Sequence, residues 1–221
     1  MPHHVFVTGG TGYLGRALLV ALRSRGHTVR ALVRPGSESR LPPGVPWVYG
    51  DALDATSYAA HVAPADTLVQ LVGVPHPSPA KALEFEKVDR ASGLAAVAAA
   101  RAAGVRHLVY VSVAQPAPVM RAYVAARAAV EAEIRAAHAA GGLRATILRP
   151  WYVLGPGHRW PHLLRPLYAV LRRLPATRDG ATRLGLVTHA EMVAALVRAV
   201  ESPALGVVVV DVPGIRSARA A

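Results

Sequence analysis

The fold is decided by residues 5–16, which read VFVTGGTGYLGR. A short apolar run passes into a cluster of glycines and a helical pattern begins at once, so the order is strand, tight turn, helix. Glycines here allow a sharp turn, let a pyrophosphate approach the backbone, and at Gly15 let the helix pack close to the strand. The helix N-terminus then presents free N–H groups to phosphates. We therefore predict a dinucleotide-binding turn made by Gly9, Gly10, Thr11, Gly12, Tyr13, Leu14 and Gly15.

The rest of the chain continues this alternation of strands and helices. Apolar runs predict strands at 4–8, 28–33, 47–49, 67–72, 106–112, 144–148 and 207–210. The segments between them predict helices at 12–25, 55–61, 80–103, 119–140 and 188–200. The strands lack alternating polar residues, as strands buried on both faces do. This pattern predicts an α/β fold with a doubly wound, Rossmann-like parallel sheet covered by helices on both sides.

After Pro150 the pattern loosens into a small C-terminal lobe. Residues 1–150 predict the dinucleotide-binding core, and residues 151–221 predict a lobe that lines the substrate cleft and packs a last helix and strand on the core. Together they form one structural domain. In the lobe we expect a kinked helix or lid at 161–174, a strand at 183–187 and a tail at 213–221.

Composition limits the class of protein. With 221 residues and 52% hydrophobic side chains, the chain can bury the core of one ordinary domain. It has no cysteine, no apolar stretch long enough to span a membrane, and no room for a signal peptide before its first strand. We therefore expect a cytoplasmic protein without disulfides. The histidines show no metal-ligand spacing, so we expect no metal.

The chain is strongly basic, with a formal net charge of +12. Its arginines are scattered over many helices rather than clustered, so we expect a small-molecule partner and no nucleic acid. The basic apolar segment 163–174 leaves open a contact with an anionic membrane surface, but a lid over the site is the favoured interpretation. The oligomeric state stays open between monomer and homodimer.

The end of the second strand indicates which dinucleotide is bound. In this fold an acidic residue there accepts the ribose hydroxyls of NAD, whereas a basic residue accepts the 2′-phosphate of NADP. Val33 stands where the acid would be, Arg34 follows it, and Ser37 could add to the pocket. A guanidinium can stack on adenine and still fork onto a phosphate. The sequence thus favours NADP over NAD.

The segment 8–15, TGGTGYLG, resembles the first turn of the extended and atypical short-chain dehydrogenase/reductases, which include epimerase-like proteins. Residues 148–157, LRPWYVLGPG, are similar to the later LRPxxVYGPG signature of that family, and the two motifs occur in the family's order. The resemblance implies binding of NAD or NADP. It also implies an oxidoreductase or epimerase-like activity on a small molecule whose identity the sequence does not indicate.

The resemblance implies further cofactor contacts at the ends of strands. They are Asp51, Ala52, Leu71, Val72, Gly73, Val111 and Pro150. Asp51 matches the aspartate that binds the adenine amino group, and Leu71 to Gly73 match the backbone that passes beneath the adenosine and ribose. Residues 88–93, VDRASG, resemble the segment that supports the site.

The catalytic pattern of the family is altered in this chain. Active members pair a tyrosine with a lysine four residues later on one helical face, and the lysine lowers the tyrosine pKa for proton transfer. Here Tyr123 is followed by Arg127, and Ala114 replaces the expected hydroxyl residue, which leaves Ser112 as the remaining candidate. We assign Tyr123, Arg127 and Ser112 to catalysis. The alternative is that Tyr123 is a half-buried helix residue and Arg127 a solvated one.

Aromatic residues follow the sixth strand. We assign Trp151, Tyr152 and His158 to the substrate cleft, which would suit an apolar or aromatic ligand, with His158 as a further proton-transfer group. The alternative is a packed turn.

A second function also stays open, because Arg127 and Ala114 favour a non-catalytic NAD(P)H sensor or accessory protein. Such a protein would be similar to nitrogen-metabolite-repression regulators or to the dinucleotide-binding subunit of respiratory complex I.

Overall fold

A parallel sheet forms the centre of the computed structural model, which describes residues 1–154 and 178–218. Seven strands follow the order β3-β2-β1-β4-β5-β6-β9. Their bounds are β1 His4–Thr8, β2 Thr28–Val33, β3 Trp47–Tyr49, β4 Thr67–Gln70, β5 His107–Val111, β6 Arg144–Leu148 and β9 Val207–Val210. Every neighbouring pair in this sheet runs parallel, so all the carboxyl ends lie at one edge. The predicted doubly wound parallel sheet is confirmed.

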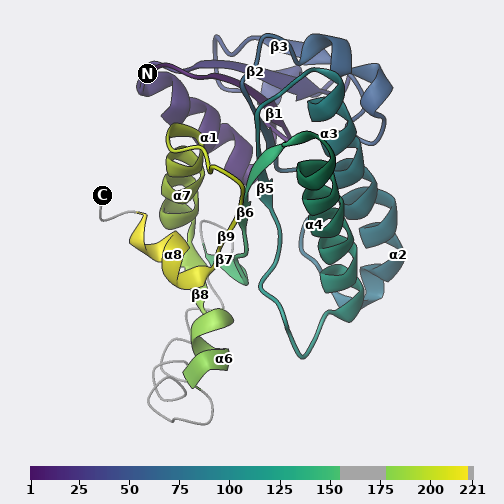
Figure 1. Ribbon diagram of the computed structural model, residues 1–221, viewed down its shortest axis with the longest axis vertical. Helices are drawn as coiled ribbons and strands as arrows, with labels where there is room; N and C mark the ends of the chain where they lie inside the picture. Colours follow the sequence, from purple (N-terminus) through teal and green to yellow (C-terminus); the bar gives the residue numbers. More distant parts are fainter. Residues whose placement is uncertain (155–177, 219–221) are drawn as a thin grey trace.

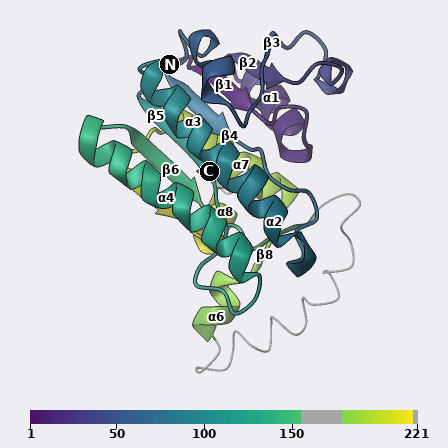
Figure 2. The ribbon, with the colours of Figure 1, turned by 90° about the vertical axis from the view of Figure 1, so that its right-hand side faces the viewer.

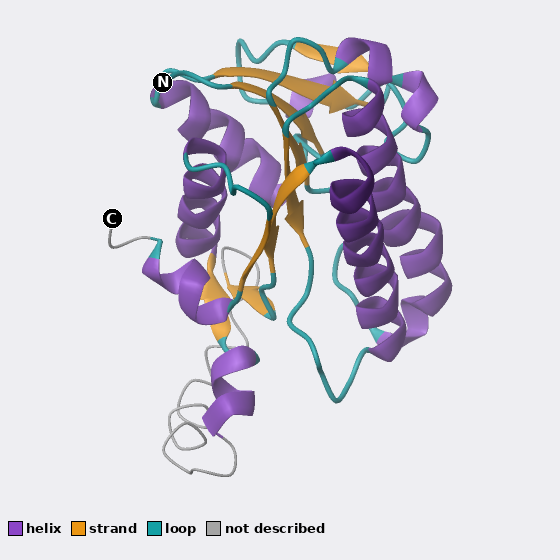
Figure 3. Ribbon diagram, viewed as in Figure 1, coloured by secondary structure: helices purple, strands orange, loops and turns teal. Residues whose placement is uncertain are grey.

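Helices cover both faces of this sheet. Figure 1 shows α1 (Tyr13–Ser24), α7 (His189–Glu201) and α8 (Val212–Ser217) on one face and α3 (Ala91–Ala102) and α4 (Arg121–Gly141) on the other. The layers are clear in Figure 3, where the strands stand between the two groups of helices. Figure 2 shows α3 and α4 running side by side across their face. The remaining elements are α2 (Ala82–Glu84), α6 (Arg178–Arg183), and β7 (Tyr152–Leu154) paired with β8 (Leu186–Thr188).

Alternate residues of β1 fill the two layers of core. Val5 and Val7 are buried in one cluster with side chains of α1 and α7 such as Leu196, whereas Phe6 is buried in the other with Ala99 of α3. This follows from the period of two along a strand. Each large apolar side chain buried in this way contributes roughly 1.5–3 kcal/mol. The two layers therefore hold the carboxyl edge of the sheet in a defined place.

The strand order reverses between β1 and β4. β1 leads to β2 on one side, while β4 lies on the other side of β1 and leads onward to β5. Thr8 pairs with Gln70 at this edge, and the Leu71 N–H donates to the Thr8 carbonyl at 3.1 Å. In open α/β sheets, ligands bind in the crevice where such a reversal occurs. The reversal between β1 and β4 therefore marks the expected ligand-binding site of this sheet.

The long helix expected over 80–103 is present without a break, but its first half is not a regular α-helix. Its first part consists of a 3₁₀ turn (Pro79–Lys81), α2 and a π-helical segment (Phe85–Arg90), and only then does α3 begin. Phe85 and Asp89 are both buried in the π-helical segment, so the wider turn brings an aromatic ring and a carboxylate inward together. The helix expected over 55–61 is likewise replaced by two 3₁₀ turns, Ala55–Ser57 and Ala59–His61.

Two expectations for the C-terminal lobe are wrong. The strand expected over 183–187 is β8, which begins three residues later and ends one residue later than expected, because α6 continues to Arg183. The tail expected over 213–221 instead contains α8, whose first turn is capped by the Asp211 carboxylate accepting the Gly214 N–H at 3.1 Å. Ile215 of α8 is fully buried, so this segment belongs to the core. The lid helix expected over 161–174 falls within residues 155–177, outside the described residues.

Other expectations for this lobe have mixed outcomes. The predicted helix start at Thr188 is confirmed by a reciprocal cap, in which the Thr188 hydroxyl accepts the Glu191 N–H and the Glu191 carboxylate accepts the Thr188 N–H. Tyr152–Leu154 forms the strand β7 rather than the packed turn that was the alternative interpretation of this segment. β7 pairs with β8, which gives these residues backbone partners across the lobe.

Candidate functional site

The turn between β1 and α1 brings backbone atoms into close contact. Gly9 has a φ of 75°, and a Cβ there would lie 2.8 Å from the Leu71 carbonyl carbon, so a side chain does not fit. At Gly15 a Cβ would meet the Gly9 carbonyl oxygen and lie 2.7 Å from the Gly10 Cα. The fold itself therefore requires glycine at both positions, as the sequence predicts for Gly15.

Gly12 differs from these two, because its backbone conformation (φ −80°, ψ 177°) suits any residue. In the described part of the chain, a Cβ added there would approach one atom beyond its neighbours, the Gly9 carbonyl oxygen at 3.1 Å. Gly12 is the N-cap of α1, no side chain caps this helix end, and the first turn holds no acid. The Gly12 N–H itself donates to the Gly9 carbonyl at 3.0 Å, so the N–H groups available to an anion are those of the first helical turn after Gly12, and the open side of Gly12 fits a pyrophosphate.

The other predicted residues of the turn surround this helix start. Thr11 and Leu14 are half-buried, and Leu14 packs against the core beneath. Tyr13 is 37% exposed, and its ring centroid lies 4.2 Å from that of His189 at the start of α7. The His189 ring also lies 3.2 Å from the Tyr13 carbonyl oxygen. The C-terminal lobe thus contacts the turn through α7.

The end of β2 presents a cation to solvent. Val33 is buried, whereas Arg34 is exposed and Ser37 is half-buried. The next acid along the chain, Glu38, accepts the Gly36 N–H at 3.0 Å. Hydrogen bonds from the Tyr49 hydroxyl and from the loop backbone hold the pKa of Glu38 below its usual value. The carboxylate is therefore engaged by its own loop, and the exposed Arg34 fits a 2′-phosphate.

Asp51 follows β3 at the same edge of the sheet. It is exposed, its Oδ1 accepts the Leu53 N–H at 2.9 Å, and its own N–H donates to the Ser57 hydroxyl at 2.9 Å. Ala52 beside it is half-buried. The loop is thus held in shape by local hydrogen bonds, and the Asp51 carboxylate stays accessible at the side of the crevice where an adenine would lie.

Leu71, Val72 and Gly73 join the turn to the second half of the site. Leu71 and Val72 lie against Gly9, as the space around that glycine shows. A Cβ on Gly73 would collide with the Arg127 guanidinium and lie 2.9 Å from the Asp89 carboxylate. This short segment therefore runs from the glycine turn to the predicted catalytic residues.

Arg127 is buried, with 5% of its surface exposed. Its Nη2 lies 2.5 Å from the Asp89 Oδ1, and its Nη1 donates to the Val111 carbonyl at 2.5 Å. Burial alone would lower the pKa of Arg127, but Tyr123, Tyr110 and Asp89 around it raise the pKa above the usual arginine value. The guanidinium therefore stays charged, and the alternative of a solvated Arg127 is wrong.

Tyr123 lies one helical turn before Arg127 on the same side of α4. The Arg127 Cζ is 5.3 Å from the Tyr123 ring centroid and 5.7 Å from that of Tyr110 in β5. The Tyr123 ring is half-buried and lies 4.9 Å from the Phe85 ring. Burial raises the pKa of Tyr110 to about 12, although Arg127 acts in the opposite direction. The predicted pair is thus brought together, with Tyr123 as its less buried member.

Ser112 has a structural partner. Its side chain is buried, and its hydroxyl donates to the Glu131 Oε1 at 2.6 Å. Glu131 also accepts from Gln115 at 2.7 Å and forms a two-pronged ion pair with Arg149, at 2.9 and 2.5 Å. The hydroxyl of Ser112 is therefore occupied by Glu131. Ala114, two residues further on, is buried and carries no hydroxyl.

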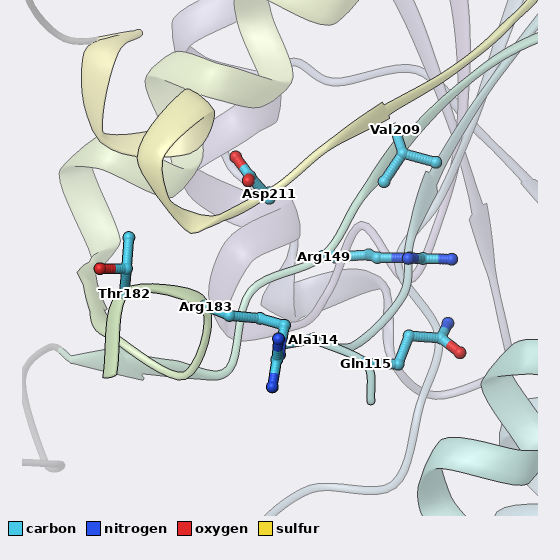
Figure 4. A pocket seen from close by; sticks show the side chains of 7 residues that line it. All are labelled: Ala114, Gln115, Arg149, Thr182, Arg183, Val209 and Asp211. Atoms are coloured by element: carbon cyan, nitrogen blue, oxygen red, sulfur yellow. The ribbon is translucent and has the colours of Figure 1, made fainter. Parts of the chain in front are cut away.

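A cavity of about 610 Å³ opens beside this network (Figure 4). Its lining comes from the loop after β5, from the ends of β6 and β9, and from α6. The lining residues are Ala114, Gln115, Arg149, Thr182, Arg183, Val209 and Asp211. Because most of these side chains are polar or charged, the cavity favours a polar ligand over the apolar or aromatic one expected from the sequence.

The predicted aromatic residues lie elsewhere. Trp151 and Tyr152 are half-buried, and neither lines this cavity. Tyr152 lies in β7, where it pairs with Leu186 of β8. Pro150 is buried, and its carbonyl accepts the Ala114 N–H at 2.9 Å. His158 lies outside the described residues.

In residues 1–154 and 178–218, no group of three or more acidic, histidine or cysteine side chains could hold a metal ion. None of the helices in these ranges combines the length and the apolar character that crossing a membrane requires.

The fold and the site define a class of protein. A parallel sheet, a glycine turn at its reversal, and a tyrosine four residues before a basic residue on the helix after β5 are the marks of an extended, atypical short-chain dehydrogenase/reductase. More narrowly, the chain belongs to the NAD dependent epimerase/dehydratase family, whose model matches residues 5–211.

Curated relatives include two reductases. The chain is 34% identical over 212 residues to a ceramide reductase of Caulobacter vibrioides, covering 92% of this chain and 63% of the relative. It is 35% identical over 225 residues to a 3-diazoavenalumate denitrifying reductase of a Streptomyces species, covering 91% and 73%. The chain thus spans less than two thirds of the first relative's length.

Solved structures show the same fold. A UDP-galactose 4-epimerase aligns with a TM-score of 0.70 at 21% identity, covering 94% of this chain and 78% of the epimerase. The Thermus thermophilus UDP-glucose 4-epimerase in complex with NAD aligns with a TM-score of 0.69 at 20% identity, covering 98% and 82%. At these identities the likeness concerns the fold alone.

Some residues of the site were missed in the sequence. Glu131 follows Arg127 by four residues, and this spacing places it on the face of α4 that also carries Tyr123. This four-residue spacing in the sequence could have identified Glu131 as a residue of the site. Arg183 and Asp211 reach the cavity from distant segments, and no local pattern indicates them.

Proposed function

We propose that the protein is an NAD(P)H-dependent oxidoreductase that reduces a carbonyl group of a small molecule, with NADPH preferred over NADH. The observation that carries the proposal is the segment of Leu71 to Gly73. It contacts the glycine turn at one end and the Arg127–Asp89 pair at the other. A dinucleotide laid along this segment would therefore reach from the turn to Tyr123.

Each end of the cofactor has residues that fit it. The N–H groups around Gly12 would hold the pyrophosphate, and Arg34 would hold the 2′-phosphate. Asp51 would accept a hydrogen bond from the adenine amino group.

When bound, the reduced nicotinamide supplies a hydride to the carbonyl carbon. The Tyr123 phenol gives its proton to the carbonyl oxygen, which yields an alcohol, and Tyr123 regains a proton from solvent.

The relatives support reduction over epimerisation. The two curated relatives described above cover 92% and 91% of this chain at 34% and 35% identity and are named as reductases, whereas the UDP-glucose 4-epimerase of Azospirillum brasilense covers 68% of it at 30% identity. The polar lining of the cavity around Arg149 and Arg183 favours a substrate with several hydrogen-bonding groups. For this chain we therefore propose a polar carbonyl compound.

The proposal is tested by measuring binding and turnover separately. Fluorescence titration should show tight NADPH binding, and a panel of polar carbonyl compounds should include one that oxidises NADPH. Tyr123→Phe should then abolish turnover while NADPH still binds. The matched control is Tyr58→Phe, which removes a buried hydroxyl that has no hydrogen-bond partner in the described part of the chain. Turnover that survives in Tyr123→Phe would contradict the assigned proton donor.

A non-catalytic sensor is the second candidate. Three observations favour it: two nitrogens of Arg127 are already bonded, Ser112 is occupied by Glu131, and Ala114 has no hydroxyl. A sensor would bind NADPH, show no turnover with any carbonyl compound, and change its oligomeric state or a partner contact on binding. Analytical ultracentrifugation with and without NADPH separates this outcome from the first.

A further inference from the structure

The carboxylate of Asp89 is fully buried. A buried charge is costly unless it is paired and hydrogen-bonded. Both oxygens of Asp89 have such partners: Oδ1 lies 2.5 Å from Arg127 Nη2, and Oδ2 accepts the Val74 N–H at 3.1 Å. Asp89 therefore ties α4 to the loop that follows β4.

Gly73 leaves room for this pair. Any side chain at Gly73 would displace the Arg127 guanidinium, as its Cβ would collide with Nη2 and approach the Asp89 carboxylate. The ion pair therefore requires glycine at position 73. The guanidinium lies against the segment from Leu71 to Gly73, along which we propose that the cofactor binds.

Arg127 is held in one orientation. One nitrogen is bonded to Asp89, a second to the Val111 carbonyl, and the guanidinium carbon lies within 6 Å of two tyrosine rings, at 5.3 Å from Tyr123 and 5.7 Å from Tyr110. Contacts of this length are cation–π interactions. The Nε is buried and has no hydrogen-bond partner among the described residues. The charge next to Tyr123 is thus fixed in position and opposed by one anion.

We infer that Asp89 is a positioning residue, which holds Arg127 against Tyr123 and balances its charge so that the phenol keeps its proton for carbonyl reduction. A lone cation beside a phenol favours the phenolate, which accepts a proton and so promotes alcohol oxidation. A cation paired with a carboxylate has a weaker effect. Asp89 therefore biases the site towards reduction. This inference rests on the proposed function.

Among the described residues, the other charged or titratable groups near Tyr123 lie on β5, on α4 and on the π-helical segment. Tyr110 faces Arg127 from β5, and Glu131 lies one turn further along α4 but is paired with Arg149. On the π-helical segment, Glu86, Lys87 and Arg90 are exposed, and Glu86 pairs with Arg90 at 3.2 Å. Asp89 is therefore the acid whose removal should change the charge at Tyr123.

The test titrates Tyr123 in the protein without cofactor or substrate. The near-ultraviolet absorbance of tyrosinate is followed against pH, and the signal of Tyr123 is obtained by subtracting the curve of the same protein carrying Tyr123→Phe. Asp89→Asn should move the Tyr123 ionisation midpoint to lower pH by roughly one unit. Glu86→Gln, which removes an exposed acid from the same segment, should leave the midpoint unchanged. Equal midpoints in Asp89→Asn and Glu86→Gln would overturn the inference.

A double variant controls for misfolding of Asp89→Asn. Asp89→Asn alone leaves a buried cation unpaired, whereas Asp89→Asn with Arg127→Gln removes both charges and should fold, with a midpoint close to that of the parent. If the double variant shows the same low midpoint as Asp89→Asn, the effect does not act through Arg127 and the inference fails. NADPH titration of the parent is run beside these measurements. A parent that binds no NADPH would refute the proposed function without affecting the result for Asp89.

Discussion

At the scale of single residues, two arginines of the site have opposite surroundings. Arg127 is buried, paired with Asp89 and bonded to a backbone carbonyl, whereas Arg34 is exposed at the end of β2. The sequence places both beside the expected cofactor, but it does not distinguish a buried guanidinium from a solvated one. Burial depends on Gly73 and Asp89, which come from other segments and leave space and a counter-charge for Arg127.

Arg34 should determine the choice of dinucleotide. Arg34→Ala removes the charge-assisted contact with the 2′-phosphate, which is worth roughly 1.5–3 kcal/mol, so NADPH affinity should fall by about one to two orders of magnitude. NADH affinity should change little, because NADH lacks that phosphate. Arg101→Ala, an exposed arginine on α3, serves as the control. If the parent binds NADH as tightly as NADPH, the role given to Arg34 is incorrect.

His107 should make the stability of the protein depend on pH. It is buried in β5 with its Nε2 3.0 Å from the Thr146 hydroxyl, and burial, with a further contribution from Arg144, lowers its pKa from 6.5 to about 4. Between these values the unfolded chain binds more protons at this position than the folded chain. The contribution of neutral, buried His107 to the free energy of unfolding is therefore fully present above about pH 6.5, and it is lost as the pH falls towards 4.

The magnitude of this loss is roughly 3 kcal/mol at most, from about 1.4 kcal/mol per unit of pKa shift. Urea unfolding of the parent and of His107→Gln at several pH values between 4 and 7 measures it. The difference in the free energy of unfolding between the parent and His107→Gln should shrink as the pH falls. His61→Gln, at an exposed histidine, should keep a constant difference from the parent. A constant difference for His107→Gln as well would contradict the assignment.

At the scale of elements, the strands could be predicted closely and the helices less so. The apolar runs that form β1, β2, β3, β6 and β9 have the expected bounds. In β1, β2 and β6 most residues are buried, as continuous apolar sequence indicates, whereas the edge strands β3 and β9 are half-buried or exposed. The π-helical segment was missed, since its burial of Phe85 and Asp89 depends on partners in α4. α8 was missed because six residues with a proline and a glycine carry little helical periodicity.

α8 should contribute to the stability of the whole domain. Ile215 is fully buried in the cluster that includes α1 and α7, so Ile215→Ala should lower the free energy of unfolding by roughly 2–5 kcal/mol. Leu205→Ala, at a side chain that is 91% exposed, should cost far less. Denaturant unfolding of both variants measures the two effects. Similar small losses would mean that α8 is a dispensable tail, as the sequence had suggested.

At the scale of the whole molecule, the parallel sheet brings together residues that are far apart in the chain. Gly9, Leu71, Val111, Arg149 and Asp211 each follow or end a strand, and the common direction of the strands places all of them at one edge. The glycine turn at this edge could be predicted, because it is a local motif, and its role as the cofactor site stays a prediction. The cavity could not, because its lining combines side chains from four separate segments.

The central claim is that a dinucleotide binds over the glycine turn, and Gly12→Val tests it most directly. The backbone conformation at Gly12 suits a side chain, and the added Cβ would lie 3.1 Å from the Gly9 carbonyl oxygen, a tight contact that a small shift of the turn relieves, so the variant should fold. The side chain should nevertheless occupy the place of the pyrophosphate. Isothermal titration should show no NADPH binding by Gly12→Val, while its far-ultraviolet circular dichroism matches that of the parent. Gly141→Val, where an added Cβ meets no atom within 4 Å, should bind normally. A folded Gly12→Val protein that binds NADPH as tightly as the parent would contradict the account.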